Sequence, residues 1–147
     1  MKYPVVYLDG MTEKAESFVY STWLKSYRNT DWGRNMCNDT YFHHHKEIID
    51  VILASPLTRV TIIADKDDQD TFYGYIVCQV VSGKPIVHYC YMKYNFRKLH
   101  LMSGLISHLG YFDSNNVHFV THLPRHYPKL KTKYNLEFNP YLLGDNK

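Results

Sequence analysis

The chain has 147 residues, a formal net charge of +3 and 45% hydrophobic residues. This length predicts one domain, residues 1–147, whose hydrophobic core needs neither metals nor disulfides. The small net charge does not by itself predict nucleic-acid binding. No run reaches the roughly 18 apolar residues of a membrane-spanning helix, and the N-terminus lacks a signal-peptide pattern, so we expect a cytoplasmic protein without a membrane partner.

The cysteines and tyrosines add two expectations. The 3 cysteines have no metal-like spacing, and Cys78 and Cys90 lie in apolar, strand-like runs. They are therefore expected to be reduced thiols in the core. The 14 tyrosines provide amphipathic surface suited to contacts with a protein partner. Such a composition is also typical of an AT-rich viral genome, in which case we expect the protein in the host cytoplasm or the virion.

The first part of the chain predicts one strand followed by two helices. The strand covers residues 3–8 and ends at a turn. Thr12 is expected to cap a helix that runs to about Tyr27. Thr40 is expected to cap a second helix that ends before Ser55. Helical spacing predicts that these helices bury Phe18, Val19, Thr22, Trp23 and Ser26, and Tyr41, His45, Ile48, Ile49 and Ile52, respectively.

The second part predicts a run of strands joined by hairpin turns. Strands are expected over residues 60–64, 72–81 and 86–93, then a helix over 97–109, a strand over 118–123, a short helix over 127–133 and a last strand over 136–143. Gly110 is a natural C-cap for the helix before it. The order is β-α-α-β-β-β-α-β-α-β. It predicts an α/β (α+β) fold, with a mixed central sheet and flanking helices.

The segment from Ile86 to Leu109, IVHYCYMKYNFRKLHLMSGLISHL, is the most informative part of the sequence. It predicts a strand, a short basic turn and a helix. Arg97 and Lys98 lie where the turn enters the helix. A helix N-terminus presents unbonded N–H groups and the positive end of the helix dipole. The segment is therefore a candidate site for an anion such as a phosphate.

This element order, and the strand-turn-helix segment within it, resembles the Gcn5-related N-acetyltransferase (GNAT) superfamily. The resemblance implies a single GNAT-like domain that binds acetyl-CoA. A central strand would pair through its backbone, here at Tyr91 and Met92, with the pantetheine arm. The following turn would wrap the pyrophosphate, with the matching residues Arg97, Lys98, Leu99, His100, Leu101 and Met102. The sequence departs from the family at His100 and Met102, where the family pattern has small residues that let the backbone approach the phosphates.

The family's chemistry is direct acyl transfer to an amine. A base takes a proton from the amine, which attacks the thioester, and an acid protonates the leaving thiolate. The resemblance makes Tyr127 the candidate acid and His122 the candidate base. The acceptor would be an amine-bearing small molecule or protein. The departure of the turn from the family pattern leaves an alternative open. This alternative is a non-catalytic GNAT-fold protein, of viral or phage origin, that binds a protein partner or has a structural role.

Several other clusters of histidine, acidic or basic residues are candidate sites for a metal ion or a nucleic acid. Consecutive helical residues point about 100° apart, so His43, His44 and His45 are not expected to close on one ion. His118, His122 and His126 lack a nearby further ligand. The acidic turn over residues 65–70 lacks the glycine and glutamate of a calcium loop. We therefore expect no metal. The basic segment 125–134 alone supports nucleic-acid binding, which we do not predict.

Overall fold

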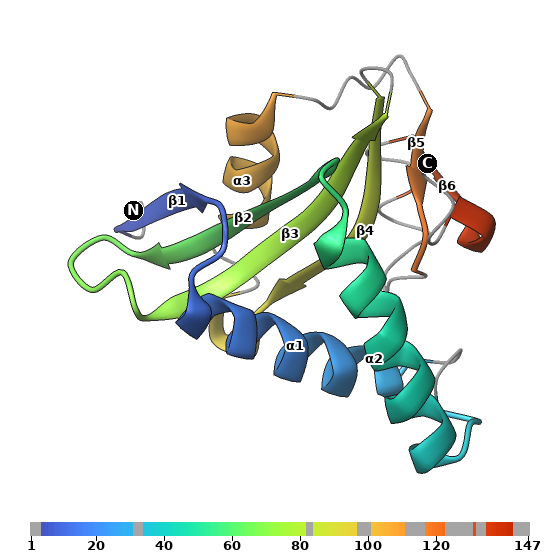
Figure 1. Cartoon of the computed structure of the whole chain (residues 1–147). Helices are drawn as coiled ribbons and strands as arrows, with labels where there is room; N and C mark the ends of the chain where they lie inside the picture. The colour runs from blue at the N-terminus through green and yellow to red at the C-terminus, as the bar shows by residue number, and fades with distance from the viewer. Residues whose placement is uncertain are drawn as a thin grey trace.

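The structure is a computed structural model that describes residues 4–30, 34–81, 84–96, 101–110, 117–122, 131 and 135–142. Six strands form one mixed sheet in the order β1-β2-β3-β4-β5-β6 (Figure 1). The first four are antiparallel, and β5 and β6 run parallel to β4 and to each other. The strands are β1 (Val5–Asp9), β2 (Thr58–Asp65), β3 (Phe72–Val81), β4 (Lys84–Met92), β5 (His118–Val120) and β6 (Leu136–Phe138).

Helices cover both faces of this sheet. Helices α1 (Glu13–Arg28) and α2 (Asn38–Ala54) share a core with one face, and α3 (Leu101–Leu109) packs on the other (Figure 1). Short 3-10 turns lie at Tyr94–Phe96 and Pro140–Leu142. The α+β class and the central hairpins predicted from the sequence are confirmed. Within the described ranges, no helix is both long enough and apolar enough to cross a bilayer.

The two N-terminal helices begin in different ways. The Thr12 hydroxyl accepts a hydrogen bond from the Ala15 N–H at 3.2 Å, which confirms the predicted cap of α1. The prediction that Thr40 caps α2 is wrong, because the Tyr41 N–H already donates to the Cys37 carbonyl and α2 begins at Asn38. A contact with α1 lies at this earlier start. The guanidinium of Arg28, at the end of α1, donates to the Asn38 side-chain oxygen at 2.8 and 3.0 Å.

Alternate residues of the central strands build two separate cores. Tyr75 and Val77 of β3 face α1 and α2, whereas Ile76 and Cys78 face α3. Since both faces of β3 are covered, its sequence is almost continuously apolar rather than alternating. The largest fully buried side chains of the first core are Trp23, Tyr41, Tyr75, Ile49, Ile52 and Ile62.

Helix α3 rests against β1 at a glycine. A Cβ atom on Gly104 would collide with the hydroxyl oxygen of Tyr7. The same helix places His108 beside the Tyr7 ring, with the ring centroids 5.0 Å apart. Gly104 therefore allows the close approach of α3 and β1. The helix ends at Gly110, whose φ of +69° suits the predicted glycine C-cap.

The C-terminal strands are shorter than predicted. Strand β5 ends at Val120 rather than at residue 123, and β6 ends at Phe138 and is followed by the 3-10 turn at Pro140–Leu142. The Asn139 N–H donates to the Val120 carbonyl at 2.8 Å and makes the last bond of the parallel β5–β6 ladder. Residues 97–100, where the third helix was expected to begin, lie outside the described residues. So does the expected short helix over 127–133, apart from Lys131.

Candidate functional site

Strand β4 contains a bulge at His88. Tyr89 is opposite Val77 and Val87 is opposite Cys78, so His88 is an extra residue without a register partner on β3. As a result, the side chains of His88 and Tyr89 both turn to the α1/α2 face, where His88 contacts Gln79. Bulges bend a strand and are common beside functional sites.

Strand β5 follows β4 for only part of its length. The register pairs are Ile86 with Phe119 and Val87 with Val120. The Thr121 N–H then donates to the Val87 carbonyl at 3.0 Å. Strand β4 continues to Met92, but no strand in the described part of the chain pairs with its β5-side edge beyond this point (Figure 1). Within the described ranges, the backbone pairing of β5 with β4 therefore ends at the bulge.

The register with β3 fixes which backbone groups point to the β5-side edge. The Lys93 N–H donates to the Tyr73 carbonyl at 2.8 Å. Because hydrogen-bonding direction alternates along an antiparallel ladder, the backbone groups of Tyr91 point toward β3 and those of Cys90 point away from it. The sequence predicted Cys90 only as a core thiol and not as a backbone contact, since only the register of β4 on β3 reveals this direction.

Gly74 holds the far end of β4 close to β3. It lies opposite Met92, and a Cβ atom at this position would collide with the Tyr91 carbonyl oxygen and lie 3.0 Å from the Met92 sulfur. The glycine therefore permits a close approach that no larger residue would allow. The position of β4 beyond the bulge depends on this contact.

A buried chain of polar side chains lies where the backbone pairing of β4 with β5 ends. Gln79 Oε1 lies 2.9 Å from His88 Nε2, and His88 Nδ1 lies 2.8 Å from Thr121 Oγ1. Thr121 Oγ1 lies 3.1 Å from His122 Nδ1. His122 Nε2 lies 2.9 Å from Nε2 of His45 on α2. The chain thus joins β3, β4, the residues after β5 and α2.

The three histidines in this buried chain of polar side chains are neutral. His45, His88 and His122 are 2%, 1% and 3% exposed. Burial lowers the pKa of His45 and of His88 to about 4. Burial also lowers the pKa of His122 well below its usual value, and the two other histidines lower it further. A hydrogen bond between the His122 ring and the His88 backbone opposes this shift.

Aromatic rings enclose His122. Trp23, Tyr27 and Tyr89 each meet its ring edge-on, with centroid separations of 5.2, 4.6 and 5.8 Å. Trp23 also stacks on Tyr89, with ring planes 4° apart. The predicted base therefore lies within the core of the α1/α2 face, held by its neighbours on several sides.

The other predicted site residues fall into two groups. Tyr91 and Met92 lie at the end of β4, Leu101 is buried at the start of α3, and Met102 follows it in the same helix. The side chain of Met102 lies outside the described structure. The remaining candidates, whose roles stay predictions, also lie outside the described residues: Arg97, Lys98, Leu99, His100 and Tyr127.

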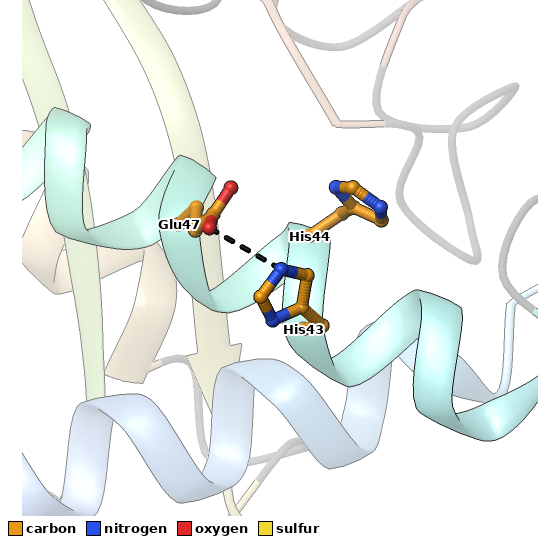
Figure 2. Close-up of side chains that lie close together, drawn as sticks. All are labelled: His43, His44 and Glu47. Atoms are coloured by element: carbon orange, nitrogen blue, oxygen red, sulfur yellow. Dashed lines mark ion pairs between the residues drawn. The ribbon is translucent and has the colours of Figure 1, made fainter.

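The histidine run on α2 separates into two environments. His45 is buried and turns toward His122, whereas His43 and His44 are exposed and lie near Glu47 (Figure 2). Potential ligand atoms of these three residues lie within 4.8 Å of one another. His43 Nε2 is 3.4 Å from a carboxylate oxygen of Glu47, one turn along the helix. The cluster lies on the exposed side of a single helix, and the expectation of no metal stays a prediction.

Comparison with solved structures identifies the fold. A putative acetyl transferase from Pyrococcus furiosus is similar over 72% of each chain, with 14% identity and a TM-score of 0.56. A possible acetyltransferase from Clostridium difficile 630 is similar over 89% of this chain and 87% of its own, with 11% identity and a TM-score of 0.56. No protein-family model and no curated protein matches the sequence. At these identities the similarity shows the fold alone, and that fold is the GNAT fold predicted from the sequence.

Proposed function

We propose that this protein transfers an acyl group, in the simplest case acetyl from acetyl-CoA, to an amine. The end of the β4–β5 pairing at the bulge is the observation that supports this function best. It leaves a stretch of β4 edge around Cys90 beside which no described strand runs. An extended ligand with amide groups can hydrogen-bond to such an edge as an added strand does. The pantetheine arm of coenzyme A has this character.

The remaining parts of a coenzyme A site are carried over from the sequence. Leu101 opens α3, and a helix N-terminus favours a diphosphate through its N–H groups and its dipole. We propose that Arg97 and Lys98 supply positive charge there, together with the backbone of the segment up to Met102. The bulk of His100 is a feature that the diphosphate would have to accommodate.

The reaction would form a C–N bond and break the thioester C–S bond. The amine loses a proton to a base, attacks the thioester carbonyl and expels the coenzyme A thiolate, which an acid protonates. We retain Tyr127 as the candidate acid and His122 as one candidate for the base; the other role open to the buried His122 ring is to position β5. The acceptor would be an amine-bearing small molecule or protein.

Calorimetric titration with acetyl-CoA and with coenzyme A tests the cofactor directly. We expect a dissociation constant in the micromolar range, about −8 kcal/mol. A Cys90→Pro variant removes the Cys90 N–H, one of the backbone N–H groups that point to the β5-side edge, and leaves the bonds to β3 in place. It should weaken binding about tenfold. The matched Cys90→Ala variant loses only the thiol and should bind as the unmodified protein does.

A second outcome would redirect the assignment. No heat and no thermal stabilisation at millimolar acetyl-CoA would contradict the enzyme proposal. The departures at His100 and Met102 favour the other candidate in that case, a GNAT-fold protein without catalysis that binds a protein partner. A variant with both residues changed to glycine that gains coenzyme A affinity would support a decayed site.

A further inference from the structure

The buried chain has a single consistent direction of hydrogen bonding. Gln79 presents its side-chain oxygen to His88 Nε2, so this nitrogen donates and His88 Nδ1 accepts. The Thr121 hydroxyl therefore donates to His88 and accepts from His122 Nδ1–H. Nε2 of His122 is then an acceptor for Nε2–H of His45. Every ring is neutral in this arrangement, as their low pKa values require.

A second contact supports the same direction. The hydrogen bond between the His122 ring and the His88 backbone raises the pKa of His122, so in it the ring donates to the carbonyl oxygen. Only the tautomer with the proton on Nδ1 combines this bond with acceptance from His45. The His122 side chain thus donates a hydrogen bond to the His88 carbonyl at the bulge. The last backbone hydrogen bond from the β5 segment, which the Thr121 N–H donates, lies just before this contact.

The Gln79 end of the buried chain of polar side chains argues against a proton relay. Gln79 carries a side-chain amide, which neither gains nor loses a proton in the physiological pH range. A proton entering the chain from the histidines would have no base to reach. The buried chain of polar side chains is better suited to hold elements in place, since buried polar networks favour one arrangement of the groups they join.

We propose that His122 is a positioning residue, which fixes where the backbone pairing of β5 with β4 ends and thereby how much of the β4 edge is left for the acyl-pantetheine arm. This inference rests on the proposed function. His122 joins the bulge carbonyl of His88, the Thr121 hydroxyl and His45 of α2 within one side chain. Its ring is enclosed by the aromatic side chains described above, so its position is fixed from the helix side as well as from the sheet.

Three substitutions separate the parts of this role. His122→Leu removes both ring nitrogens. His122→Asn keeps an amide N–H at the same distance along the side chain as Nδ1, toward Thr121 and the His88 carbonyl. His122→Gln places its amide nearer the position of Nε2, toward His45. The matched control is His118→Leu. It removes another buried histidine of the β5 segment, one that is not a member of the buried chain of polar side chains.

Two measurements apply to each variant: the acetyl-CoA dissociation constant by calorimetry, and hydrogen exchange of the Thr121 amide without ligand. We expect His122→Leu to weaken acetyl-CoA binding at least about tenfold and to speed Thr121 exchange beyond the effect of His118→Leu. We expect His122→Asn to restore both to within about threefold, and His122→Gln to restore them less. A general loss of stability would not produce this order of rescue.

The outcomes distinguish this inference from the proposed function. If the unmodified protein does not bind acetyl-CoA, the proposed function fails, while Thr121 exchange still tests the positioning of β5. If His122→Leu and His118→Leu behave alike in both measurements, the positioning role is wrong. If affinity and exchange are unchanged while turnover with an amine acceptor falls about 10²- to 10⁴-fold, His122 is the base instead.

Discussion

The Nε2 atom of His122 lies 2.9 Å from the Nε2 atom of His45, which joins the residues after β5 to the middle of α2. The two residues are 77 positions apart in the chain, and both are buried among aromatic rings. A contact of this kind requires that at least one ring be neutral, because two adjacent imidazolium groups without a counter-charge would repel each other. It therefore links the stability of the protein to pH.

We expect the free energy of unfolding to fall as the pH drops from about 6.5 to 4. Burial lowers the pKa of His45 and His88 to about 4 in the folded state, so in this window the unfolded chain binds more protons and gains stability. The contribution is full above pH 6.5 and is lost on the way to pH 4. A shift of this size corresponds to about 3 kcal/mol for one histidine.

Urea denaturation at several pH values checks this prediction. A His45→Phe variant lacks one of the titrating groups and should show a shallower fall over the same window. The carboxylates of Asp50 and Asp65, whose pKa values are lowered from 3.8, lose their contribution below about pH 5, so the fall between pH 6.5 and pH 5 reports on the histidines. A free energy of unfolding that stays constant from pH 7 to pH 4.5 would contradict neutral burial of the histidines.

Gly104→Ala should destabilise the protein despite the better helix propensity of alanine. The new Cβ would collide with the Tyr7 hydroxyl, and overpacking of this kind costs about 1–3 kcal/mol, against a gain of about 1 kcal/mol in propensity. Tyr7→Phe removes the hydroxyl, so the double variant should recover most of the loss. Chemical denaturation of the two single variants and the double variant measures this coupling. Additive losses would show that the Tyr7 contact does not control the packing of α3.

Gly74→Ala should weaken acetyl-CoA binding about tenfold if the proposed site is right. Its Cβ would push the Tyr91 carbonyl away from β3 and move the stretch of β4 that carries Cys90. The comparison is Gly10→Ala, which strains a backbone with φ of +114° far from β4 and meets no atom within 4 Å. Both variants should lose stability, but only Gly74→Ala should change the calorimetric affinity. Equal affinities in the two variants would argue against β4 as the pantetheine strand.

Cys37 should be the first thiol to react with an alkylating reagent near neutral pH. It is exposed at the start of α2, and the backbone N–H groups of Thr40 and Asp39 favour its thiolate and lower its pKa. Burial raises the pKa of Cys90 to about 11 and that of Cys78 further. Mass spectrometry of partially alkylated protein should locate the first adduct on Cys37, and Cys37→Ser should remove the fast phase. Faster labelling of Cys90 would show that β4 opens in solution.

Local patterns in the sequence determined the elements and the fold. The Thr12 cap, the apolar run of β3, the hairpin turns and the spacing in α1 and α2 act over a few residues, so they can be recognised without knowledge of the rest of the chain. Their order was enough to predict the mixed sheet and its GNAT-like arrangement. The error at Thr40 lies where α2 begins earlier, at Asn38, whose side chain accepts a hydrogen bond from Arg28 at the end of α1.

Only the tertiary structure decided how the candidate site is built. The bulge at His88 depends on the register between β3 and β4, which the apolar pattern of the two strands does not specify. The end of the β4–β5 pairing and the direction of the Cys90 backbone depend on that register, and the meeting of His45 with His122 depends on how α2 packs on the sheet. These contacts join residues far apart in sequence, and their formation depends on how whole elements pack, so no local pattern predicts them.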